Sequence, residues 1–165
     1  MLTYIGNHGP DGAPDEANAD ALIEMLFFAY RDFTRDADDI LAGMGFGRAH
    51  HRVLHFIDRK QGLTVAELLT LLGITKQSLA RVLKDLVESG HVRQSVANTD
   101  RRQRNLHLTR DGDALIAALR APQSRRINAA LAQCGLEHSV VEEFLDAMLD
   151  DESRTQRTGL DALGG

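Results

Sequence analysis

The sequence of 165 residues has no tryptophan, one cysteine and three prolines, and aromatic residues make up 5 % of it. The single cysteine, Cys134, excludes an intrachain disulfide framework and a zinc site built from several cysteines. No apolar run approaches the roughly 18 residues that span a bilayer. The first residues also lack the basic start and apolar run of a signal peptide. We therefore expect a cytoplasmic protein with no membrane partner.

Enough apolar residues remain to build a core, since they make up 43 % of the chain. Because aromatic residues are scarce, this core must consist mainly of Leu, Ala, Val and Ile. Charged residues, at 26 %, are at an ordinary level for a globular protein. The length fits one domain or one compact subunit of a dimer.

The charges are distributed unevenly along this acidic chain, whose net charge is −5. Residues 75–110 hold eight lysines and arginines against three acidic residues, whereas residues 137–152 hold seven acidic residues and no lysine or arginine. A basic block within an acidic chain indicates a local anionic partner, although chance clustering is the alternative.

Apolar residues at three- and four-residue steps predict a series of helices. After a flexible arm at residues 1–14, a helix of roughly 28 residues begins at Asp15 and ends at the glycines of 43–47. Shorter helices follow at about 48–59, from Thr64 to Gly73, and from Thr75 to Gly90. Thr64 and Glu67 have the spacing of a capping box. The helix that begins at Asp15 is long and lies near a chain end, and such helices often pack against a partner subunit.

The period then changes, and residues 92–96 and 106–108 alternate like strands around a polar, charged tip. Thr109 caps a further helix that runs to Gly135, in which Pro122 should cause a kink or a break. A last helix is expected from Glu137, and residues 156–165 are expected to form a tail. The predicted fold class is therefore mainly α with a small β-hairpin wing.

The two short helices joined at residues 73–75 have the proportions of a helix-turn-helix. The second helix would place its first residues in the major groove of double-stranded DNA. Gln77 can bridge adenine and Arg81 can bridge guanine, while Thr75 and Ser78 suit phosphate oxygens. The outward side chains expected to bind DNA are Thr75, Lys76, Gln77, Ser78, Arg81 and Lys84. A solvated helix face is the alternative interpretation.

The hairpin that follows directly makes this segment a winged helix-turn-helix. Its tip contains Arg101, Arg102 and Arg104, which are expected to bind DNA as well. Asp100 and Arg102 lie two residues apart, so in an extended segment both can point the same way. The carboxylate could then orient the guanidinium for a narrow minor groove. A solvated turn with an exposed ion pair is the alternative.

The stretch GLTVAELLTLLGITKQSLARVLKDLVESGHV and the later DRRQRNLHLTRDG resemble the MarR (SlyA) regulators. The resemblance covers about residues 20–152 and includes the wing spacing of Asp100, Arg102, Leu106, Leu108, Thr109 and Gly112. It implies an obligate homodimer whose dimerisation region comprises residues 15–46 and 111–155, with the winged helix at 47–110. It also implies that Lys76, Gln77, Ser78 and Arg81 face the major groove and that Arg102 faces the minor groove.

The resemblance further implies a small-molecule effector bound between the dimerisation region and the winged helix. Pro122 departs from the family, whose corresponding helix is usually continuous. The predicted function is sequence-specific transcriptional regulation on an inverted-repeat operator. A winged helix that binds proteins without sequence-specific DNA binding is the alternative.

Other kinds of site have weaker support in the sequence. His51 and His55 share a helix face near His50, but no nearby carboxylate completes a metal set, so no metal or other cofactor is expected. Cys134 lies in an apolar pattern typical of a small core residue, and a redox switch is the alternative. We find no nucleophile–base set, phosphate loop or paired catalytic carboxylates, and therefore expect no enzyme activity.

Overall fold

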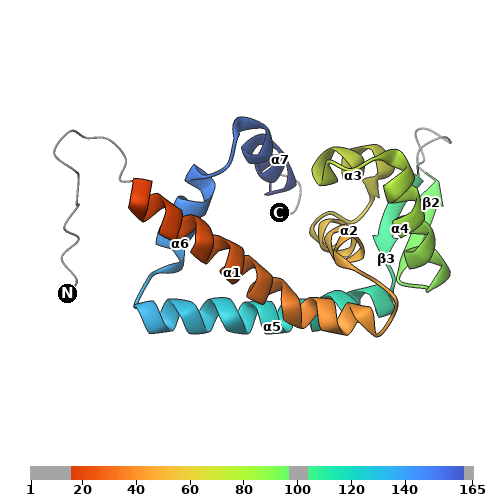
Figure 1. The fold of residues 1–165 in the computed structure, drawn as a ribbon. Helices are drawn as coiled ribbons and strands as arrows, with labels where there is room; N and C mark the ends of the chain where they lie inside the picture. Colours follow the sequence, from red (N-terminus) through yellow and green to blue (C-terminus); the bar gives the residue numbers. More distant parts are fainter. Residues whose placement is uncertain (1–15, 97–103, 162–165) are drawn as a thin grey trace. The chain divides into compact units, whose positions relative to one another are not determined.

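The computed structural model describes residues 16–96 and 104–161 (Figure 1). Its helices are α1 (Glu16–Ala42), α2 (Arg48–Arg59), α3 (Val65–Leu72), α4 (Lys76–Glu88), α5 (Arg110–Cys134), α6 (His138–Ala147) and α7 (Asp151–Asp161). Its strands are β1 (Leu63–Thr64), β2 (Val92–Val96) and β3 (Arg104–Leu108). The predicted class, mainly α with a small β wing, is confirmed. The chain divides into two units, residues 1–35 and 36–165, which are described separately.

Several helix boundaries follow the caps expected from the sequence. The Thr64 hydroxyl accepts a hydrogen bond from the Glu67 amide at 3.2 Å, and the Glu67 carboxylate accepts one from the Thr64 amide at 2.8 Å. This is the predicted capping box, which satisfies amides that the helix leaves free. Thr75 and Thr109 cap α4 and α5 through their hydroxyl groups alone, which accept hydrogen bonds from the amides of Ser78 and Gly112. Gly73 ends α3 in the left-handed conformation, with φ of 61°.

The three strands form an antiparallel sheet in the order β1-β3-β2. Leu106 of β3 pairs with Leu63 of β1, and Val92 of β2 pairs with Leu108. The sequence predicted the hairpin of β2 and β3, although β3 begins two residues earlier than expected. It did not predict β1, because two residues are too few to show an alternating pattern.

The buried core is composed of Leu, Val, Ile and Ala, as the composition predicted. Its members come from α2, α3, α4, α5 and the sheet, together with the end of α1. The residues of α2 contact α3, α4, α5 and β3, so this helix is the platform on which α4 rests. Leu54 and Ile57 of α2 are completely buried there, as are Leu79 and Leu86 of α4.

Gly112, near the start of α5, packs directly against the main chain that leads into β2. A Cβ atom at this position would lie 2.1 Å from the carbonyl oxygen of His91. The same carbonyl accepts a hydrogen bond from the Thr109 amide at 3.0 Å. The glycine of the wing pattern is therefore required by this close approach, which joins the wing to α5.

α5 continues through Pro122 from Arg110 to Cys134, so of the predicted kink or break, the break does not occur. Proline removes one hydrogen bond to the carbonyl four residues earlier, which belongs to Ala118. Ala118 is exposed, and water can therefore satisfy this carbonyl. The remaining hydrogen bonds of a helix of 25 residues maintain its course.

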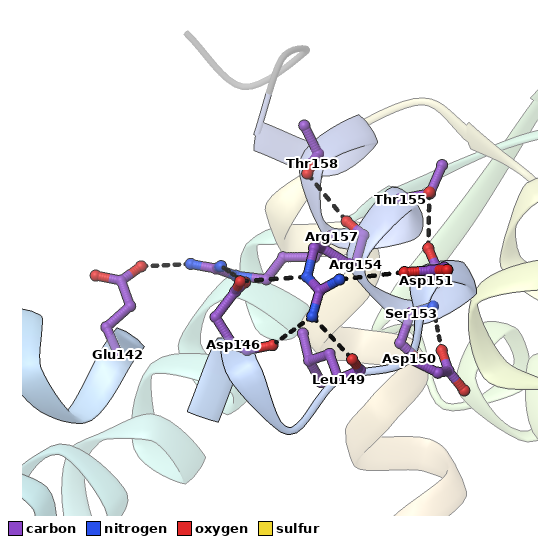
Figure 2. Close-up of polar contacts among 10 residues, drawn as sticks. All are labelled: Glu142, Asp146, Leu149, Asp150, Asp151, Ser153, Arg154, Thr155, Arg157 and Thr158. Atoms are coloured by element: carbon purple, nitrogen blue, oxygen red, sulfur yellow. Dashed lines mark hydrogen bonds and ion pairs between the residues drawn. The ribbon is translucent and has the colours of Figure 1, made fainter. Parts of the chain in front are cut away.

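α6 and α7 form a helical hairpin, residues 138–161, that is joined by ion pairs (Figure 2). Arg157 bridges Glu142 and Asp146, and its Nη1 lies 2.8 Å from Asp146 Oδ1. Arg154 donates to the carbonyl oxygens of Asp146 and Leu149 at 3.1 and 2.9 Å. α7 thus includes residues that the sequence assigned to a tail; its few apolar residues gave no helical period.

The unit at residues 1–35 contains the first part of α1. Large apolar side chains on it are exposed, and they include Leu22, Met25, Phe27 and Tyr30. No helix among the described residues is both long and apolar enough to cross a membrane.

Candidate nucleic-acid interface

The side chains predicted to read DNA lie on the exposed side of α4 and at its start. Thr75, Lys76, Gln77, Ser78, Arg81 and Lys84 are all exposed. The opposite side is buried through Leu79, Val82, Leu83 and Leu86. Because these apolar residues lie in the core, the polar side of α4 has a fixed direction. The expected exposure is confirmed, while the role of each side chain in binding DNA stays a prediction.

The start of α4 presents two linked hydroxyl groups. Thr75 Oγ1 accepts a hydrogen bond from the Ser78 amide at 3.1 Å and donates one to Ser78 Oγ at 2.9 Å. The Ser78 hydroxyl then has its own hydrogen available for another acceptor. Together with the positive end of the helix dipole, this arrangement suits a phosphate oxygen at the first turn of α4.

The base of the wing approaches the start of α4. Arg104 of β3 pairs in register with Val96 of β2 and is exposed. Arg104 and Lys76 border the same groove, of about 390 Å³, whose other lining residues come from the start of α3 and from α4. These two predicted DNA-binding cations are therefore brought to one surface. Asp100, Arg101 and Arg102 lie outside the described residues.

One histidine of the wing does not add to its positive charge. Burial lowers the pKa of His107, and the nearby positive charge of Arg93 lowers it further. The imidazole of His107 is therefore neutral near pH 7. The positive charge of the described wing strands comes from arginines, including the exposed Arg93 of β2, which the predicted site did not include.

The acidic side chains of α4 are each matched by a neighbouring group. Glu88 lies 3.8 Å from the ammonium group of Lys84. Asp85 is half-buried and contacts His50 of α2, with 3.2 Å between Oδ2 and Nε2. Sequence reasoning missed this contact, because the two residues are 35 positions apart and share no local pattern.

The three histidines of α2 have different surroundings, since His50 contacts Asp85 whereas His51 and His55 do not share this partner. Burial is the main cause that lowers the pKa of both His51 and His55, so both imidazoles are neutral near pH 7. Among the described residues, no group of three or more His, Cys, Asp or Glu side chains could hold a metal ion. Cys134 is exposed at the end of α5, so its assignment to a core position is wrong for the single chain.

A separate cavity of about 680 Å³ lies between α2, α3 and the α6–α7 hairpin. Phe56, Leu71 and Leu160 supply apolar walls, and His55 and Arg59 supply polar groups. A volume of this size lies within the range of small-molecule sites. It is bordered by α2, the helix that also supports α4.

The chain is similar to known transcriptional regulators along most of its length. The sequence profile of the MarR family matches residues 44–103. The HTH-type transcriptional regulator PetP of Rhodobacter capsulatus is 47 % identical over 133 residues, which cover 80 % of each chain.

Solved structures share the fold at lower identity. MarR of Staphylococcus aureus in complex with salicylate and kanamycin has a TM-score of 0.63 and 21 % identity, with 81 % of this chain and 89 % of that chain covered. A mutant MarR of E. coli in complex with operator DNA has a TM-score of 0.60 and 20 % identity, with 84 % and 100 % covered. These likenesses establish the winged-helix fold.

Proposed function

The chain belongs to the MarR family of transcriptional regulators, and we propose that it acts as a homodimer that reads an inverted-repeat operator through α4 and the wing. The observation that carries this proposal is the row of exposed polar side chains on α4, whose opposite side is buried in the core. A rigid helix with Gln77 and Arg81 outward can present both side chains to base edges. Lys76 and Arg104, at one groove, would bind the phosphate backbone around it.

The homodimer is supported by apolar surface that the single chain leaves exposed. α6 has no buried residue, and Phe144 and Met148 are both more than half exposed. An apolar groove of about 400 Å³ lies between α5 and α6 and is lined by residues such as Leu131, Val141 and Leu145. A second copy would cover such surface, and two-fold symmetry would place half-sites about 10 base pairs apart.

Tuning by a small ligand is supported by the cavity beside α2. Its size and mixed lining suit a small molecule, and its wall Phe56 belongs to the helix that carries α4. The S. aureus MarR structure contains salicylate, so salicylate is a suitable first probe. An increase in the melting temperature with salicylate, absent in a Leu71→Trp variant that fills the cavity, would support ligand binding there.

The decisive experiment is a selection of binding sites from randomised duplex DNA at near-physiological salt. Enrichment of an inverted repeat by a dimer would support the proposal. No enrichment by folded, dimeric protein, or binding that is insensitive to salt, would favour the protein-interaction alternative, because phosphate contacts make DNA affinity fall steeply with salt.

Variants can then assign the roles of the side chains. Arg81→Ala should lower the free energy of binding to the operator by about 1–3 kcal/mol and relax the base preference at one position of each half-site. Arg102→Ala should instead weaken binding more evenly across sequences. Arg125→Ala is the matched control, since it removes the same charge from an exposed position of α5. If Arg81→Ala and Arg125→Ala behave alike, α4 does not read bases through Arg81.

A further inference from the structure

Arg81 and Asp85 stand one helical turn apart on α4, a spacing at which opposite charges on a helix surface normally attract each other. Such a pair would compete with DNA, because a guanidinium bound to a carboxylate must release it before it can bridge guanine. In the structure Arg81 forms no ion pair with any described residue, and Asp85 contacts His50 instead. The partner of Asp85 therefore affects the availability of Arg81.

The His50 ring is held from three directions. Its Nδ1 accepts a hydrogen bond from the Gly47 amide at 3.1 Å. Its face stacks on Phe46, with 4.6 Å between ring centroids and 10° between planes. Since Nδ1 is an acceptor, the hydrogen of the neutral ring resides on Nε2, which donates to Asp85 Oδ2 at 3.2 Å. This ring presents one donor to the carboxylate in a fixed direction.

The contact is also sheltered. The side chain of His50 is only 12 % exposed, whereas that of Asp85 is 39 % exposed. α2, which carries His50, is fixed in the core through Leu54 and Ile57. The imidazole therefore engages the carboxylate from the protein side of α4. No such group among the described residues holds Arg81, which remains on the exposed side.

We propose that His50 is a positioning residue for DNA reading: it engages Asp85 and thereby leaves Arg81 unpaired for a guanine edge. This inference rests on the proposed function, and it identifies the His50 imidazole as the group that keeps Arg81 available to DNA. Loss of the imidazole would release Asp85 toward Arg81, and the base preference due to Arg81 would fall. His50 itself touches no DNA.

The test is a double-mutant cycle on the operator selected by the wild-type protein. The readout is the ratio of affinities for that operator and for one changed at the base pair that Arg81→Ala identifies. His50→Ala should lower this ratio about two- to tenfold, within the range of a helix ion pair and a partly lost base contact. Asp85→Ala should preserve the ratio, and the double variant should restore it to the level of Asp85→Ala.

Two controls separate positioning from other effects. Glu88→Ala removes an equal charge from α4 and should change overall affinity while leaving the ratio unchanged. If His50→Ala is poorly folded by circular dichroism, His50→Leu and Asp85→Asn replace the two variants in the same cycle, since leucine fills space but has no hydrogen-bond donor. The Leu variant should lower the ratio in the wild-type background and leave it unchanged with Asp85→Asn.

The proposal is overturned if loss of the His50 imidazole leaves the ratio at the wild-type value, or if removal of the Asp85 charge does not rescue it. The second result would mean that His50 only maintains the packing of α4. If the wild-type protein selects no DNA, the proposed function fails first and this inference fails with it.

Discussion

The winged helix and the α6–α7 hairpin are stabilised by different forces. In the winged helix, α2 and α4 bury Leu54, Ile57, Leu79 and Leu86 completely. In the hairpin, α6 buries no residue, and its described contacts with α7 are made by partly exposed arginines and carboxylates (Figure 2). Burial of apolar surface contributes far more free energy than exposed ion pairs. We therefore expect the winged helix to be the more stable of the two regions within a single chain.

A cavity in the core of the winged helix should cause the largest loss in the free energy of unfolding. Leu54→Ala should lower the free energy of unfolding by about 2–5 kcal/mol, because it removes a buried side chain and leaves a void. Urea denaturation followed by circular dichroism measures this change. Leu145→Ala of α6 is the matched control, since Leu145 is 50 % exposed. Equal losses for both variants at protein concentrations where the chain is monomeric would contradict the comparison.

The junction of the wing with α5 should be the next most sensitive point. Gly112→Ala places a Cβ atom against the His91 carbonyl, and the main chain must move to accommodate it. We expect a loss of about 1–3 kcal/mol, the usual cost of overpacking. Gly159→Ala, in α7, is the control, because a Cβ atom there would meet no neighbouring atom of the described residues within 4 Å. A thermal melt that is unchanged by Gly112→Ala would show that the wing tolerates this shift.

Acid should weaken the start of α3. Burial raises the pKa of Glu67, but hydrogen bonds from Lys60 and Thr64 outweigh it and hold the pKa at about 2. Because this pKa is below the unfolded value of roughly 4.3, the contribution to stability is complete above that value. It should be lost as the pH falls toward 2. Glu67→Gln should flatten this part of the stability profile, and a profile identical to wild type would contradict the assignment.

The smallest effect is expected when the ion pairs of the hairpin are weakened. Asp146→Asn removes the charge that Arg154 and Arg157 share, and salt near 1 M shortens the screening length to about 3 Å. Hydrogen exchange of α7 amides should quicken under either condition, while that of α4 remains unchanged. Glu143→Gln of α6 is the control variant. Unchanged exchange in α7 would mean that packing, and not charge, holds the hairpin.

Local patterns in the sequence predicted much of this structure. The Thr64–Glu67 box, the caps at Thr75 and Thr109 and the left-handed Gly73 depend on atoms a few residues apart, so their spacing is visible in the chain. The apolar period also predicted which side of α4 is buried. The need for glycine at position 112 is explained only by the fold, because the His91 carbonyl that a Cβ atom would meet is distant in the sequence.

By itself, the sequence determined the helices from α1 to α6, the hairpin of β2 and β3 and the set of side chains that α4 exposes. Only the tertiary structure decided that β1 joins β3, that α7 folds back on α6 and that His50 engages Asp85. The physical reason is the range of the interactions: caps and amphipathic periods act within a turn or two of helix. Strand pairing, ion pairs between helices and burial instead depend on segments that meet only when the chain has folded.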